Sequence, residues 1–89
     1  MLFVAIGSVR AGTSQERMAR RLTWDYPPGL KSVAEYITPS ANPAVVSIAE
    51  ADDIGPVLAA TGAWDDVISW TVLPVVTAEQ AMEMAKKMA

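Results

Sequence analysis

Residues 30–53, LKSVAEYITPSANPAVVSIAEADD, contain the segment that sets the topology of the chain. The stretch 30–38 alternates between two sets of side chains, as a β-strand does, and 44–49 is a second strand-like run. The polar loop PSANP separates them, and so short a connection predicts an antiparallel hairpin. In its turn, Ser40 and Asn42 are expected to satisfy local backbone groups with their short polar side chains.

Two further strands flank this hairpin at a distance. The first, MLFVAIGSV at residues 1–9, is apolar on both alternations, which is typical of a central strand that is covered on both sides. The second, residues 68–76, is rich in Val, Ile and Trp. With the hairpin they make four strands.

A helix is predicted over residues 13–22, between the first strand and the hairpin. Thr13 and Glu16 have the spacing of a capping box, in which each side chain accepts a hydrogen bond from the other residue's backbone N–H. Met18 and Leu22 lie four residues apart, so we expect them to form its inward contacts.

Two more helices follow the hairpin. Asp53 precedes Ile-Gly-Pro and is expected to cap a helix that ends near Gly62. Thr77 and Gln80 repeat the capping-box spacing and open a final helix through about Met88. The residues expected near one side of that final helix are Ala81, Met82, Ala85 and Met88.

The resulting order is β-α-β-β-α-β with an added C-terminal helix, an α+β chain of the ferredoxin-like pattern in one domain, 1–89. Two helices cover only one face of a four-stranded sheet, and the other face is also apolar. The chain is 52% hydrophobic, above the usual share of about 45 to 50%. Because a large exposed apolar patch marks an interface, we expect a homodimer packed sheet to sheet.

Composition excludes several kinds of chemistry. The chain has no Cys and no His, which removes disulfides, thiolate nucleophiles, the commonest transition-metal ligands and a His-ligated haem. No metal and no cofactor are therefore expected. The formal charge of −3 argues against a nucleic-acid partner. No stretch is long and apolar enough for a membrane span, and no basic leader precedes the first strand, so we expect a cytoplasmic protein without membrane contact.

The chain resembles the dimeric α+β barrel superfamily, in which two ferredoxin-like subunits join their sheets into a barrel. The element order carries this resemblance, together with MLFVAIGSVRAGTS at the start and AWDDVISWTVLPVVTAEQA near the end. It is most similar to small prokaryotic members without an assigned function, related to the antibiotic-biosynthesis monooxygenase and stress-responsive barrel families. The resemblance implies the fold, and the fold alone implies no activity.

Five aromatic residues, Trp24, Tyr26, Tyr36, Trp64 and Trp70, are the main candidates for a ligand site. Aromatic side chains from the sheet and its loops could line a cleft beneath the helices, with Asn42 among its polar groups. The ligand-binding residues predicted on this basis are Tyr36, Asn42, Trp64 and Trp70. The alternative, which the sequence favours, is that these aromatic residues belong to the core or to the dimer interface.

Other motifs favour structural roles. GSVRAGTS at 7–14 has the glycine spacing of a phosphate loop but lacks its lysine, so a strand end, turn and helix cap are favoured. Arg17, Arg20 and Arg21 share one helix face, which either binds an anion or faces solvent, the latter being favoured. The adjacent Asp65–Asp66 pair is more typical of an acidic turn than of an acid/base site.

Three functions remain open. The first is binding of a small apolar or aromatic metabolite by the dimer. The second is a cofactor-free monooxygenase or isomerase acting on an activated aromatic substrate, which the resemblance implies and which needs no His if the substrate supplies the carbanion. The third is a structural or protein-interaction dimer. The catalytic residues of any such enzyme are not identified by the sequence.

Overall fold

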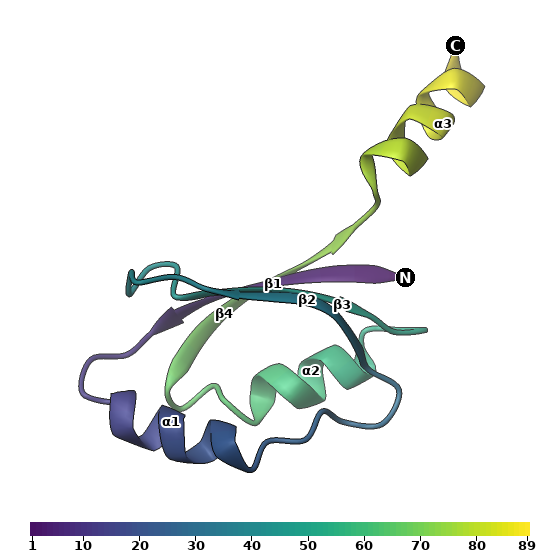
Figure 1. The fold of residues 1–89 in the computed structure, drawn as a ribbon. Helices are drawn as coiled ribbons and strands as arrows, with labels where there is room; N and C mark the ends of the chain where they lie inside the picture. Colours follow the sequence, from purple (N-terminus) through teal and green to yellow (C-terminus); the bar gives the residue numbers. More distant parts are fainter.

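A computed structural model describes all 89 residues, and its elements follow the predicted order. Their bounds are β1 Leu2–Val9, α1 Ser14–Leu22, β2 Lys31–Ile37, β3 Val45–Glu50, α2 Gly55–Gly62, β4 Ile68–Val75 and α3 Ala78–Met88. The strands form one sheet, α1 and α2 lie together on one side of it, and α3 extends away from the body (Figure 1). The chain is thus an α+β protein.

The four strands are ordered β2-β3-β1-β4, and every neighbouring pair is antiparallel. This order is compatible with the ferredoxin-like pattern. β1, which was predicted to be central, lies between β3 and β4 and has the longest apolar run of the four strands, although no helix covers one of its two faces. The β2–β3 hairpin forms as predicted, with a register irregularity between Ser32 and Ala34.

A small core fills the space between the sheet and its two helices. One cluster joins Phe3 of β1 to Val57 of α2 and to Ala51. A second cluster contains Trp64, Val67 and Ile68 at the start of β4. Only 10 of the 89 residues are buried, so much of the apolar surface of this chain is left uncovered.

Gly7 of β1 is the position where side chains of the two neighbouring strands come closest to the β1 backbone on the helix side of the sheet. A Cβ atom at this position would lie 2.6 Å from Val45, 2.7 Å from Ile68 and 2.9 Å from Trp70. These distances are shorter than any normal carbon–carbon contact. Glycine therefore allows the side chains of β3 and β4 to close over β1.

The sheet face opposite α1 and α2 is uncovered, and we call it the open face (Figure 1). Successive side chains of a strand point to opposite faces of the sheet, and residues paired across neighbouring strands point to the same face. The strand residues that alternate with the core residues, together with their paired neighbours, therefore form the open face. Its residues are Leu2, Val4, Ile6 and Ser8 of β1, Lys31, Ala34 and Tyr36 of β2, Val46, Ile48 and Glu50 of β3, and Ser69, Thr71, Leu73 and Val75 of β4.

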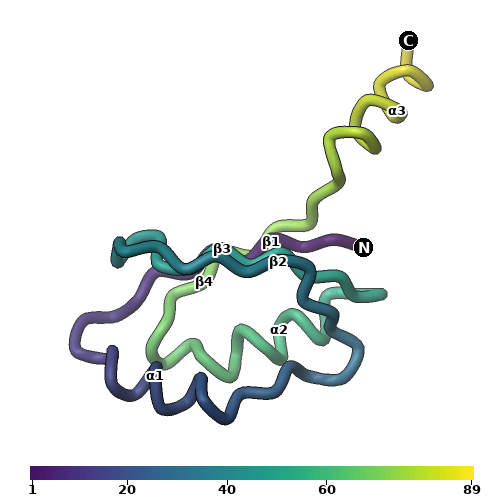
Figure 2. The backbone as a smooth tube through the Cα atoms, viewed as in Figure 1, coloured from purple at the N-terminus to yellow at the C-terminus, as the bar shows by residue number.

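The C-terminal helix stands clear of the sheet, as the backbone trace shows (Figure 2). Every residue of α3 is exposed. The predicted capping box is confirmed at its start, where Thr77 Oγ1 accepts a hydrogen bond from the Gln80 N–H at 3.0 Å. In return, the Gln80 side chain accepts one from the Thr77 N–H at 2.9 Å.

The expected capping box of α1 is wrong. Thr13 Oγ1 donates to the Arg10 carbonyl at 2.7 Å and accepts from Arg17 Nε at 2.9 Å, so it does not cap the helix. The Asp53 cap also differs. Ile54 occupies the N-cap position of α2, and Asp53 instead accepts a hydrogen bond from the Gly55 N–H at 2.8 Å in a turn before the helix.

The predicted inward contacts of α1 are wrong as well. Met18 is 69% exposed and Leu22 is 83% exposed, so both point away from the body. Arg20 is the residue of α1 that points inward. Its guanidinium lies 5.3 Å from the ring centre of Trp64 and donates hydrogen bonds to Asp66 and Glu16. The rotation of α1 is therefore set by cation–π and ionic contacts with residues distant in the sequence.

Candidate functional site

The open face presents rows of apolar side chains across its strands. Val4 lies between Ile48 of β3 and Leu73 of β4. The next row contains Tyr36, Val46, Ile6 and Thr71, which come from all four strands. Leu73 is 48% exposed and Tyr36 is 61% exposed. No helix covers this face of the sheet (Figure 1).

Side chains become smaller and more polar toward one end of the open face. Along β1 the series Leu2, Val4, Ile6 ends at Ser8, whose partner on β4 is Ser69. Ser8 Oγ donates a hydrogen bond to Asn42 Oδ1 at 2.5 Å, which brings the hairpin turn to this end. The face therefore combines an apolar centre with hydroxyl and amide groups at one end.

The hairpin turn that carries Asn42 is held by its own polar side chains. Thr38 Oγ1 donates to the Pro43 carbonyl at 2.5 Å and accepts from the Ser40 N–H at 3.1 Å. Ser40 Oγ accepts from the Asn42 N–H at 3.1 Å. The Asn42–Pro43 peptide bond is cis. Ser40 thus satisfies a local backbone group, as the sequence predicts, whereas the Asn42 side chain bonds to β1 instead of to the turn.

Aromatic rings gather on the other side of the sheet. Trp24 packs edge-on against Trp64, with ring centres 5.5 Å apart, and against Tyr26 at 5.9 Å. Arg20 covers the face of Trp64 at 5.3 Å. Trp64 is only 7% exposed. This cluster is part of the packing between α1, the loop after it and the start of β4.

Ion pairs surround the aromatic cluster. Arg20 donates a hydrogen bond to Asp66 Oδ1 at 2.7 Å and another to Glu16 Oε1 at 2.8 Å. The hydrogen bond to Asp66 lowers the pKa of that carboxyl group. Arg21 pairs with Glu35 of β2, which also accepts a hydrogen bond from the Tyr26 hydroxyl at 3.0 Å. Arg20 and Arg21 are thus engaged by carboxylates, rather than binding an anion or facing solvent freely.

The sheet separates the four predicted ligand-binding residues into two pairs. Tyr36 and Asn42 lie on the side of the open face. Trp64 and Trp70 lie on the helix side, where both belong to the second core cluster. Trp70 Nε1 is buried there without a hydrogen-bond partner. The structure therefore does not bring the four residues together around one cleft.

The aliphatic residues at the centre of the open face were not among the predicted site residues. They are Val4, Ile6, Val46, Ile48 and Leu73. The period-two alternation of their strands is the signal that places them on one face. Sequence alone does not show whether a helix covers that face, so the same pattern also fits core residues.

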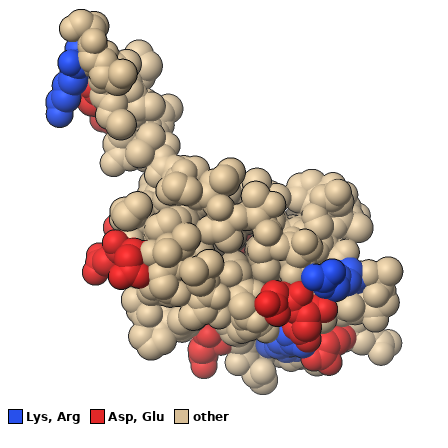
Figure 3. Space-filling view, turned by 180° about the vertical axis from the view of Figure 1, so that it is seen from behind, with Lys and Arg blue, Asp and Glu red and all other residues tan.

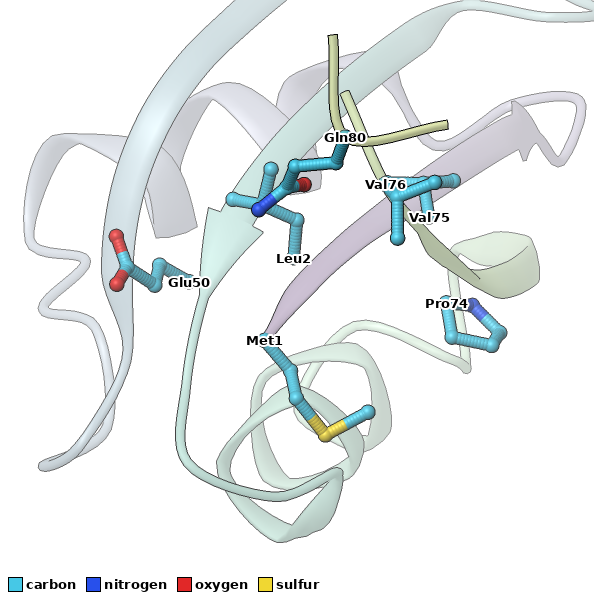
Figure 4. Close-up of a pocket in the computed structure, with 7 residues that line it drawn as sticks. All are labelled: Met1, Leu2, Glu50, Pro74, Val75, Val76 and Gln80. Atoms are coloured by element: carbon cyan, nitrogen blue, oxygen red, sulfur yellow. The ribbon is translucent and has the colours of Figure 1, made fainter. Parts of the chain in front are cut away.

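An open groove of about 610 Å³ lies where α3 leaves the body (Figure 4). Its lining residues are Met1, Leu2, Glu50, Pro74, Val75, Val76 and Gln80. Leu2, Glu50 and Val75 are also open-face residues, so the groove continues that face toward α3.

Charged groups are sparse on the face of the molecule seen in Figure 3, where they form small separate groups with uncharged surface between them. No group of three or more His, Cys, Asp or Glu side chains is placed to hold a metal ion. None of the helices has the length and apolar character needed to cross a membrane.

Comparison with known families finds a match over the whole chain. The model of a domain of unknown function, DUF3303, matches residues 1–89. No curated protein matches the chain. No solved structure matches it either.

Proposed function

The chain belongs to the DUF3303 family, a domain of unknown function, and from its geometry we propose that it is a ferredoxin-like subunit of a homodimeric α+β barrel. In this dimer the two open faces meet and enclose a chamber for a small apolar or aromatic metabolite. The observation that carries the proposal is the uncovered, apolar open face.

The accessible surface supports a partner on this face. A compact monomer of 9.5 kDa exposes about 5,000 Å². This protomer exposes 6110 Å². The excess of about 1,000 Å² exceeds the roughly 800 Å² that each partner buries in a stable interface. Part of this excess comes from α3, which stands clear of the body, and burial of the open face by an identical open face reduces the exposed area further in both copies at once.

The shape of the open face supports a chamber at its polar end. Packed sheets stand about 10 Å apart, and large side chains from both faces fill that space. Val4, Ile48 and Leu73 are large enough to do so. Ser8 and Ser69 are small, so the space between the two sheets is expected to stay open at this end.

The groups around this chamber define the ligand that fits it. Apolar walls come from Ile6, Val46 and the Tyr36 ring, and the hydroxyls of Ser69 and Thr71 are exposed to it. A compact, mostly apolar or aromatic molecule with one hydrogen-bonding group matches such a lining. An aromatic ring that carries one uncharged hydroxyl group is the simplest example of such a ligand.

Thermal unfolding in the presence of 1-naphthol tests this binding. A ligand at ten times its Kd adds about 1.4 kcal/mol of stability per site, which is several degrees in Tm for a chain of this size. The wild type is expected to gain this shift, whereas Ser69→Leu, which fills the chamber, loses it. Ser14→Leu, which is on α1 beyond the sheet, is the matched control and keeps it.

A wild-type dimer whose Tm does not respond to 1-naphthol would contradict the chamber. In that case a dimer that serves protein interaction becomes the better account of the open face.

A further inference from the structure

The C-terminal helix α3 has a continuous apolar face with nothing packed on it. At 100° per residue, one side of the helix carries only Ala and Met, and the other carries only Glu, Gln and Lys. The apolar side consists of Ala78, Ala81, Met82, Met84, Ala85 and Met88. Met82 is 61% exposed, Met84 54% and Met88 84%.

A helix of this length is not stable by itself. Isolated helices shorter than about 12 to 15 residues are marginal in water, because nucleation is costly and few hydrogen bonds follow. The α3 helix has 11 residues. Its capping box favours the helical state at one end only. Packing of its apolar face on another surface is therefore needed to hold it helical.

Its own protomer does not supply that surface. The radius of gyration is 14.8 Å, against about 12 Å for a compact chain of 89 residues. The longest dimension is 51 Å and the shortest 17 Å, because α3 extends the molecule. All its residues are exposed.

The direction of α3 indicates which surface can pack on its apolar side. It lies on the open-face side of the sheet, opposite to α1 and α2 (Figure 1). The apolar surface also continues from the open face into α3 through Val75 and Val76, which line the groove at its base. A partner that covers the open face is therefore in reach of α3.

We propose that α3 is an arm that packs its Ala/Met face on a second copy of the chain, outside the sheet-to-sheet contact. This inference rests on the proposed dimer. At 1.5 Å per residue, α3 is about 16 Å long, which is close to the width of about 14 Å of a four-stranded sheet. Methionine side chains suit such a contact because they adapt to irregular apolar surfaces.

The outer strand β2 of the second copy is the edge that best fits the arm. Its exposed side chains outside the open face are Val33 at 53% and Ile37 at 74%. On the other edge strand, β4, Leu73 is the one large hydrophobic residue that is exposed to a similar degree. The arm and β2 thus each present an apolar surface that lacks a contact within one protomer.

Paramagnetic broadening between chains tests the arm. The chain has no Cys, so Lys87→Cys on the polar side of α3 accepts one nitroxide label. The labelled chain is mixed with ¹⁵N-labelled wild type, and only signals of the wild-type chain are observed. We expect the label to broaden the β2 amides of the ¹⁵N chain at least twofold, with Val33 and Ile37 most affected.

Asp25→Cys, in the exposed loop after α1, is the matched label site and is expected to leave those amides unchanged. Sedimentation of the same mixture separates the two ways of failing. A dimer without broadening from position 87 overturns the arm but leaves the sheet-to-sheet dimer standing. A monomer overturns both.

Discussion

At position 7 the packing between neighbouring strands leaves no room for any side chain, so glycine is required there. The Gly7→Ala methyl group meets Val45, Ile68 and Trp70 at 2.6 to 2.9 Å, and none of these can withdraw without disturbing β3 or β4. Overpacking of this kind costs about 1 to 3 kcal/mol. We expect Gly7→Ala to lower the free energy of unfolding by that amount in urea titration.

Gly62→Ala is the control for this substitution. A Cβ at Gly62 meets nothing within 4 Å, and the residue ends α2. Alanine there is expected to be neutral or slightly stabilising, since it favours the helix. Equal urea midpoints for the two variants would mean that Gly7 is not a tight contact.

The ion pair between Arg20 and Asp66 fixes one element, α1, against the loop before β4. Its hydrogen bond keeps the pKa of Asp66 below the ordinary value of 3.8 in the folded protein. A carboxylate with a lowered folded pKa stabilises the fold above its unfolded pKa, and loses this effect as the pH falls through the folded pKa. We expect Asp66→Asn to lower Tm near neutral pH, with the difference vanishing in acid.

Asp65→Asn changes the adjacent carboxylate, which forms no ion pair, and is expected to leave Tm unchanged at every pH. If Asp66→Asn matched wild type across the whole pH range, the pair would have no part in holding α1. The exposure of Asp66, 62%, limits the effect to a small shift.

At the scale of the elements, sequence patterns predicted the order and type of all seven, although the caps expected for α1 and α2 did not form. The rotation of α1 was not predictable from its own residues. It depends on Asp66, 46 positions away from Arg20, and on Trp64, whereas local spacing favoured Met18 and Leu22.

The candidate site was only partly predictable for a related reason. Tyr36 and Trp70 are both strand residues, and their side of the sheet depends on strand register and on the irregularity between Ser32 and Ala34. A shift of one residue moves a side chain to the opposite face. The sequence therefore identified the aromatic residues but not the face of the sheet on which each one lies. The alternation of side chains along β1 and β3, in contrast, did indicate which of their residues share the open face.

The whole molecule has two uncovered apolar surfaces, the open face and the apolar side of α3. Its exposed area of 6110 Å² is larger than a compact monomer of its mass requires. A dimer through the open faces, with each arm on the other copy, accounts for both surfaces by one symmetric contact. In such a dimer the proposed ligand chamber would lie between the subunits, and neither copy would form it alone.

Sedimentation velocity on two matched Leu→Glu variants tests the sheet-to-sheet contact most directly. Leu73 is on the open face and Leu22 is on the outer side of α1, and both are exposed in the protomer, at 48% and 83%. A buried, unpaired carboxylate costs several kcal/mol. Wild type and Leu22→Glu are expected to sediment as dimers at micromolar concentration and Leu73→Glu as a folded monomer, whereas a monomeric wild type, or a Leu73→Glu dimer as tight as wild type, would contradict the account.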